Sequence, residues 1–178
     1  MLISAVSEPL PSQSQPEDIA LNVVFEDEHL LVINKPVGLV VHPGAGNHTG
    51  TLLNALLHHE ERQASLPRAG IVHRLDKDTS GLMVVAKSLL AHTALVDWLQ
   101  EHRIDRRYHA VVRGQLIAGG TIAEPIGRHP TDRIKMAVNS KGKPACTHYK
   151  VIEKFQRHTW LEASLETGRT HPVSYTHL

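Results

Sequence analysis

The stretch that decides the fold is HRLDKDTSGL, residues His73–Leu82, with the apolar run that continues from it to Ala86. Its first six residues hold a histidine, an arginine, a lysine and two aspartates. The run Leu82–Ala86 is short, apolar and rich in branched side chains, which predicts a buried strand. The sequence therefore sets a dense group of charges directly against the protein core.

Toward the N-terminus, apolar periodicity predicts a hairpin and a helix. Val23–Phe25 and Leu30–Ile33 are apolar segments separated by an acidic turn, which is typical of two paired strands. Leu52–His59 keeps its leucines at helical spacing, and Thr51 can cap that helix. Residues 7–18 are rich in Ser, Pro and Gln, which indicates a flexible linker.

Toward the C-terminus, the pattern changes from one helix to several strands. Ser88 is a candidate N-cap for a helix that runs to about Glu101, with an inner face of Ala91, Leu95, Trp98 and Leu99. Tyr108–Val112 predicts a strand, and the alternating segments Cys146–Phe155 and Trp160–Leu165 predict an antiparallel pair. Since strands outnumber helices and short turns join them, we expect an α+β fold with a mixed, largely antiparallel sheet flanked by helices.

Composition limits the classes of protein to which this chain can belong. The 178 residues are 41% hydrophobic and 21% charged, which is typical of a globular domain. The single cysteine, Cys146, excludes a disulfide framework within the chain and suits a reducing compartment, so we expect a cytoplasmic protein. The N-terminal segment lacks the basic and apolar regions of a signal peptide. The net charge is only +1, so any nucleic-acid surface must come from local clusters.

The charged stretch offers one candidate nucleophile. Asp76 lies between Arg74 and Lys77, and nearby cations favour an ionised carboxylate that could act as a nucleophile. The alternative is an ordinary surface loop whose charges pair with one another. Asp76 and Asp78 could also form an acid–base pair of the glycosidase kind. Asp78 is, however, better suited to cap the turn Thr79–Gly81.

Neither a nucleotide loop nor a metal site is predicted by sequence spacing. The glycine-rich segment Gly44–Thr51 has the wrong glycine spacing for a P-loop and no lysine before Thr51, so a structural turn is favoured. Backbone amides ahead of the next helix could still bind a phosphate. His58 and His59 are adjacent, so they point apart on a helix, and no HExxH motif occurs. We therefore expect no metal site.

Two basic clusters could face a nucleic acid. Residues 103–113 contain four arginines and Tyr108, an aromatic side chain that could stack on an unpaired base. The other cluster is in residues 128–143 and has one acid, Asp132, against five cations, which are Arg128, Arg133, Lys135, Lys141 and Lys143. Each cluster could equally be a solvated face, and Tyr108 could be a core residue.

Longer segments of the sequence resemble one enzyme family. GIVHRLDKDTSGLMVVAK, residues Gly70–Lys87, resembles the signature of the RluA family of pseudouridine synthases, and Leu30–Gly46 resembles its first motif. The segments PRAGIVHRLD, PIGRHPTDRIKMAV, GKPACTHY and LETGRTH resemble the synthase D type, the branch that modifies large-subunit ribosomal RNA. The resemblance extends over about residues 20–171.

This resemblance implies a fold, a reaction and roles for particular residues. Members of the family have a pseudouridine synthase catalytic domain, flip a uridine out of RNA and rejoin its base to the sugar through carbon. Asp76 matches the catalytic aspartate, Tyr108 the active-site tyrosine and Arg74 an arginine that contacts RNA. No cofactor and no metal are expected, the partner is large-subunit ribosomal RNA, and the chain is expected to be a monomer. The further RNA-binding candidates are Arg128, Arg133, Lys135 and Arg169.

The sequence departs from the family pattern after His171. The family continues with Gln-Ile-Arg-Val-His, whereas this chain reads PVSYTHL, and Ser174 stands where the family has an arginine that pairs with the catalytic aspartate. We therefore expect a fragment, truncated at the C-terminus and at the N-terminus, with weak or no activity. Proteins of the synthase D type usually carry a small RNA-binding S4 domain upstream. The expected parts are a linker-like segment at 1–19, a partial catalytic domain at 20–171 and an atypical tail at 172–178. The alternatives are a non-catalytic RNA-binding module and, less favoured, a small-molecule glycosidase.

Overall fold

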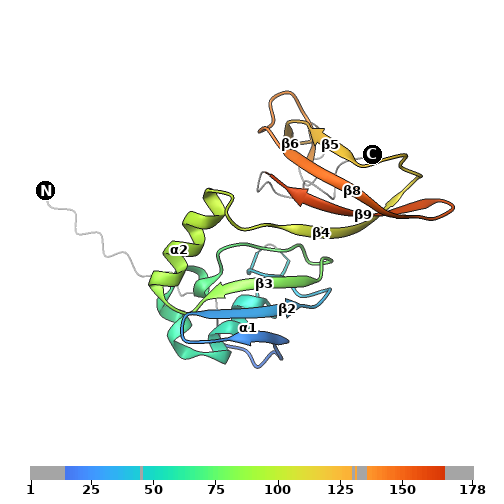
Figure 1. The fold of residues 1–178 in the computed structure, drawn as a ribbon. Coiled ribbons are helices and arrows are strands. Elements are labelled where there is room, and N and C mark those ends of the chain that lie inside the picture. The colour runs from blue at the N-terminus through green and yellow to red at the C-terminus, as the bar shows by residue number, and fades with distance from the viewer. Residues whose placement is uncertain (1–14, 45, 130, 132–135, 167–178) are drawn as a thin grey trace, which may run out of the picture. The chain divides into compact units, whose positions relative to one another are not determined.

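The computed structural model describes residues 15–44, 46–129, 131 and 136–166 (Figure 1). Contacts between α-carbons divide the chain into two compact units, Met1–Asp97 and Trp98–Leu178, and each unit is described by itself. Among the described residues, none forms a helix with both the length and the apolar character needed to cross a membrane.

The first unit is built on a three-stranded antiparallel sheet. Strands β1 (Val23–Glu26), β2 (Leu30–Lys35) and β3 (Gly81–Ala86) lie in the order β1-β2-β3. Helix α1 (Leu52–His59) and the 3-10 turns η1 (Glu61–Ser65) and η2 (Pro67–Gly70) connect β2 to β3. Helix α2 (Leu89–Gln100) follows β3 and crosses the boundary of the unit.

The core of the first unit comes from strand alternation and from α1. Leu31 and Ile33 on β2, and Met83 and Val85 on β3, are at most 1% exposed. The leucines of α1, above all Leu52 and Leu56, are also buried, as their helical spacing requires. The charged stretch therefore leads into a fully buried strand.

The beginning of α1 is fixed by side chains as well as by the backbone. The side-chain oxygen of Asn54 accepts the amide of Thr51 at 3.1 Å, and Thr51 caps the helix. The Asn54 amide group donates to the carbonyl of Gln15 at 2.8 Å, and the Glu17 carboxylate accepts the Gly50 amide at 3.1 Å. Two residues from the segment expected to be a linker thus bind the start of this helix.

Turn η2 has an unusual backbone and lies tightly against β3. Arg68 and Ala69 have φ values of 52° and 51°, in the left-handed region, and Gly70 follows with φ 78°. A β-carbon on Gly70 would meet the Ala86 carbonyl oxygen at 2.0 Å, so only glycine fits. Ile71 then pairs with Val85, which brings the next residues alongside the end of β3.

The second unit contains the remaining strands. β4 (Arg107–Arg113), β5 (Gly120–Ala123), β8 (Cys146–Lys154) and β9 (His158–Leu165) form an antiparallel sheet in the order β4-β9-β8-β5. β6 (Ile126–Arg128) and β7 (Met136–Val138) form a separate hairpin. Leu161 and Ala163 on β9 are at most 2% exposed and face the core of this unit.

Most of the elements expected from the sequence are present. α1 has the expected bounds, β8 and β9 pair antiparallel, and the Ser88 hydroxyl accepts the Ala91 amide at 3.2 Å as a cap of α2. Every strand pairing among the described residues is antiparallel, and the only parallel contact there is the isolated Val40–Thr51 bridge. The α+β prediction is confirmed.

The expected inner face of α2 is wrong at one position. Leu95 is 5% exposed and does face the core, but Trp98 is 41% exposed. The Arg103 guanidinium lies 5.3 Å from the centre of the Trp98 ring, a cation–π contact that suits an indole at the surface. Helical periodicity could not anticipate this contact.

Candidate functional site

The loop that carries Asp76 is anchored on both sides of this residue. Leu75, its neighbour, is 7% exposed and packs into the core, while Asp76 itself is half-buried. The Asp76 carbonyl accepts the Thr79 amide at 3.1 Å, which closes a turn ahead of β3. The imidazole of His73 accepts the Val84 amide at 3.1 Å and so fastens the start of the loop to β3. The Asp76 carboxylate is therefore held on a short, well-tied segment.

A buried ammonium group lies beneath this loop. Lys35, the last residue of β2, is 0% exposed, and its Nζ donates to the carbonyls of Pro36 and Leu39 at 2.9 Å and of Lys77 at 3.2 Å. Burial lowers the pKa of Lys35, while the charges of Asp76 and Asp78 act in the opposite direction. The Lys35 side chain thus links the end of β2 to the loop that carries Asp76 and places a cation near two carboxylates.

A second group of cations gathers around His42. The loop that follows β2 is tied to α1 by hydrogen bonds from the amides of Leu52 and Leu53, and it carries a half-buried His42. Burial, followed by the charges of Arg68 and Arg74, lowers the pKa of His42. Its Nε2 is buried and has no hydrogen-bond partner among the described residues. Three segments that are far apart in the sequence, those of His42, Arg68 and Arg74, therefore form one polar region with positive charge.

The arrangement in the first unit suits a polyanionic substrate. Arg68 and Arg74 are exposed, so their guanidinium groups are available to phosphates. Asp76 supplies a carboxylate on the same loop as Arg74, beside the buried Lys35. Cations of this kind can attract the phosphates of a nucleic acid, and a carboxylate held among them can act on its sugar.

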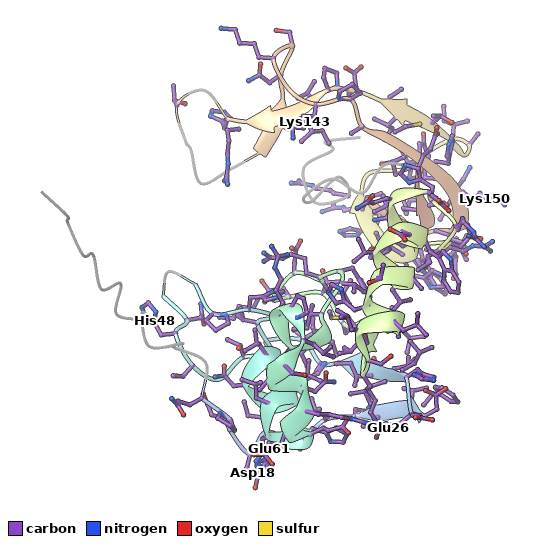
Figure 2. All side chains as sticks on the ribbon, turned by 90° about the vertical axis from the view of Figure 1, so that its left-hand side faces the viewer. Asp18, Glu26, His48, Glu61, Lys143 and Lys150 are labelled. Atoms are coloured by element: carbon purple, nitrogen blue, oxygen red, sulfur yellow. The ribbon has the colours of Figure 1, made fainter. Side chains whose placement is uncertain are left out.

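Other predicted site residues belong to the second unit. Tyr108 is half-buried on β4, opposite Ala163 of β9, and Arg128 is exposed at the end of β6. Lys143 of the predicted basic cluster lies beside the β6–β7 hairpin, is exposed and is labelled in Figure 2. The other three candidates lie outside the described residues, and they are Arg133, Lys135 and Arg169.

The second unit also brings together three side chains that the sequence analysis did not connect. His148 Nε2 lies 2.9 Å from Glu166 Oε2 and 3.8 Å from Cys146 Sγ. Hydrogen bonding to Glu166 raises the pKa of the Cys146 thiol, and the same bond lowers the pKa of Glu166. The Thr121 hydroxyl lies 2.8 Å from the other ring nitrogen of His148.

Sequence reasoning missed Lys35, His42 and Arg68. Strand alternation could have predicted that the Lys35 side chain is buried, because Lys35 stands two residues after Ile33 and therefore on the buried face of β2. His42 and Arg68 gave no such signal, since neither lies in a periodic element. Only the folded chain shows that they are neighbours of Arg74.

Comparisons with known proteins agree on one family. A family profile described as RNA pseudouridylate synthase matches residues 29–173. The chain is 59% identical over 162 residues to "Ribosomal large subunit pseudouridine synthase D" of Xanthomonas campestris pv. campestris, covering 91% of this chain and 49% of that protein. It is 60% identical over 159 residues to the protein of the same name in Escherichia coli strain K12, covering 89% of this chain and 49% of that protein.

A solved structure shares the fold. The structure titled "Human RNA Pseudouridylate Synthase Domain Containing 1" matches with a TM-score of 0.68 and 26% identity, over 93% of this chain and 64% of that one. The chain spans about half the length of the curated relatives that it matches.

Proposed function

This chain belongs to the RNA pseudouridylate synthase family, and on that premise we propose that it supplies the catalytic aspartate and part of the RNA-binding surface of an enzyme that isomerises uridine to pseudouridine. The observation that carries the proposal is the position of Asp76. It lies on a tied loop within the matched region, next to buried Lys35 and on the same loop as Arg74. The proposed substrate is large-subunit ribosomal RNA, because the relatives' names refer to the ribosomal large subunit and the family acts on RNA.

The proposed reaction begins with a uridine turned out of the RNA. A base inside a stacked helix hides the atoms that must react, so the enzyme must expose it. The Asp76 carboxylate then attacks the uridine, or stabilises positive charge on the sugar, while the bond from sugar to base nitrogen breaks. The base turns, its carbon bonds to the sugar, and any bond from the Asp76 carboxylate breaks at this step. The hydrogen on that carbon leaves as a proton, and the base nitrogen that was freed from the sugar takes up a proton. The product is an isomer of the substrate, so no redox cofactor and no metal are needed.

Other residues have supporting roles in this proposal. Tyr108 packs on the target base, and Arg74 holds RNA around the flipped nucleotide. Arg128 adds phosphate contacts in the second unit, as do three residues outside the described part of the chain, Arg133, Lys135 and Arg169. We further propose a monomeric, cytoplasmic protein, with residues 20–171 as part of the catalytic domain and residues 1–19 as a linker-like segment.

The decisive experiment uses a chimera, because the chain spans about half the length of its relatives. Residues 20–171 of this chain replace the matching residues of the Escherichia coli protein, so the chimera leaves out Ser174 and keeps that protein's own sequence beyond this segment. The chimera is given ribosomal RNA labelled with tritium at carbon 5 of uridine. We expect tritium release from the chimera and none from its Asp76→Asn variant, with RNA affinity nearly unchanged. A folded chimera that releases no tritium, or an active Asp76→Asn variant, contradicts the proposal.

A non-catalytic RNA-binding module is the second candidate. The exposed cations Arg68 and Arg74 would serve it equally well. It predicts RNA binding by the folded chimera with no tritium release, whatever residue stands at position 76. A small-molecule glycosidase would need Asp78 as much as Asp76. In that case Asp78→Asn would abolish turnover, whereas the proposed isomerase should tolerate this change because Asp78 is exposed.

A further inference from the structure

The second unit holds a thiol, an imidazole and a carboxylate at one end of its sheet. Cys146 and His148 are two residues apart on β8, so both point to the same face, while Thr147 between them is 6% exposed and points to the core. Glu166 directly follows β9, and its amide donates to the Cys146 carbonyl at 3.2 Å. Strands β8 and β9 lie side by side (Figure 1), and their register brings the residue that follows β9 against Cys146 and His148.

The ligand atoms of these three side chains are spaced as a metal ion requires. One atom from each side chain lies within 4.8 Å of both of the others. Tetrahedral Zn²⁺ with one sulfur, one nitrogen and one oxygen ligand separates these atoms by about 3.3–3.6 Å. The observed separations of 2.9 Å from nitrogen to oxygen and 3.8 Å from sulfur to nitrogen lie on either side of this range. Small rotations of the side chains would therefore admit an ion.

The imidazole already has the support that metal-bound histidines have. Such a histidine presents one ring nitrogen to the ion, and a polar partner binds the other nitrogen and fixes the ring. Here Nε2 faces Glu166 and Cys146, while Nδ1 lies 2.8 Å from the Thr121 hydroxyl on β5, the neighbouring strand. Because Thr121 and His148 are register partners, three adjacent strands fix the site.

We propose that Cys146, His148 and Glu166 form a binding site for a divalent transition-metal ion of the Zn²⁺ type. The donor set of one sulfur, one nitrogen and one oxygen suits an ion of intermediate softness and disfavours Mg²⁺ and Ca²⁺, which prefer oxygen alone. The side chains of His148 and Glu166 are 51% and 60% exposed, so solvent water can complete the coordination. Binding releases the thiol proton to solvent, because the thiolate is the ligand. The inference does not rest on the proposed function.

Spacing along the chain predicted no metal site, because no HExxH motif occurs and the adjacent His58 and His59 point apart on a helix. Cys146 and His148 alone are too few ligands, and Glu166 lies eighteen positions after His148. The third ligand is supplied by strand pairing.

Cobalt provides the test, since Co²⁺ bound to a thiolate has a charge-transfer absorption band that imidazole and carboxylate complexes lack. Cys146 is the only cysteine, so any such band reports this residue despite the fourteen histidines. We expect a saturable band with one Co²⁺ per chain, displaced by Zn²⁺ and absent from Cys146→Ser. His148→Gln and Glu166→Gln should each weaken Co²⁺ binding by about tenfold or more, as should Thr121→Val through the orientation of the ring.

The matched control is His158→Gln, which removes an exposed histidine from β9 outside the cluster. It should leave the band and the affinity unchanged, and circular dichroism should confirm that every variant is folded. Absence of the band from the folded chain overturns the proposal. A band that survives both His148→Gln and Glu166→Gln with unchanged affinity overturns it too, because Cys146 would then be binding cobalt with other partners.

Discussion

The Lys35 ammonium group donates a hydrogen bond to the backbone carbonyl of Lys77, 3.2 Å away and one residue beyond Asp76. The same ammonium also binds two carbonyls of the segment that follows β2, those of Pro36 and Leu39. One buried side chain therefore ties the first motif of the family to the loop that carries the proposed catalytic aspartate. The position of Asp76 depends on a cation that never reaches the surface.

Replacing Lys35 with methionine should destabilise the first unit by about 3 kcal/mol, since the carbonyls of Pro36 and Leu39 lose the bond from the ammonium group while that of Lys77 keeps only the Gly38 amide. Amide hydrogen exchange on β2 and β3 measures this loss, because both tryptophans, Trp98 and Trp160, lie in the second unit. The control is Lys77→Met, which removes an exposed side chain and keeps the carbonyl that Lys35 binds. Equal exchange rates in the two variants would contradict the role given to Lys35.

Replacing Gly70 with alanine should lower the free energy of unfolding by about 3 kcal/mol, because the new β-carbon would lie 2.0 Å from the Ala86 carbonyl oxygen. Two other glycines separate the effect of the steric clash from the effect of a left-handed φ. Gly38 has φ 90° but open space, so its alanine variant should lose about 1 kcal/mol. Gly44 has open space around it and an ordinary φ, so its alanine variant should have nearly the same free energy of unfolding as the unaltered protein. Thermal unfolding of the three variants should follow this order.

Replacing Arg68 with glutamine should weaken binding to ribosomal RNA fragments by about three- to tenfold and lower the slope of log affinity against log salt by about 1. The control is Arg62→Gln, which removes the same charge from a guanidinium that already pairs with Glu60. Titrations at several salt concentrations distinguish the two variants. Identical slopes for Arg68→Gln and Arg62→Gln would exclude Arg68 from the RNA surface.

The pair formed by Lys87 and Glu26 should make the stability of the first unit depend on pH at both extremes. Lys87 Nζ, on a side chain that is 8% exposed, lies 2.6 Å from Glu26 Oε1, and Glu26 marks the end of β1 in Figure 2. Hydrogen bonding between them raises the pKa of Lys87 above 10.5 and lowers the pKa of Glu26 below 4.5. The contribution of the pair is therefore complete between these values. It is lost as pH rises through the raised lysine pKa or falls through the lowered glutamate pKa.

Replacing Lys87 with methionine tests this dependence. Near neutral pH the variant should lose about 1–2 kcal/mol, because Glu26 is partly exposed and solvent weakens the pair. The difference from the unaltered protein should shrink at acid pH, where Glu26 is protonated in both. Urea unfolding at several pH values gives the measurement, with Glu28→Gln as an exposed carboxylate control. A difference that stays constant with pH would assign the effect to packing.

Local periodicity was sufficient to predict the elements that bury one regular face. The bounds of α1 followed from leucine spacing, and the β8–β9 pair followed from alternation. The cap at Ser88 followed from its side chain and its place before an apolar run. In each case the signal lies within a few residues of the feature, so sequence alone carries it.

The remaining features depend on contacts between distant segments. The left-handed backbone of Arg68 and Ala69 exists because η2 lies against the end of β3, and neither residue type favours that conformation. The cluster of Cys146, His148 and Glu166 exists because β8 and β9 pair in one register. Motif resemblance selected Asp76, but it could not reveal His42 or Lys35 beside the same loop.

The strand order of the two units has a consequence for folding kinetics. In the second unit, β8 and β9 are joined by a short turn, so their pairing closes a small loop at little entropic cost. In the first unit, β3 must find β2 across a segment that contains α1, η1 and η2, so its sheet depends on contacts that are distant in sequence. Because distant contacts slow folding, we expect the β8–β9 hairpin and the similarly local β1–β2 hairpin to form before β3 pairs with β2, and the loop of Asp76 to reach its native position late.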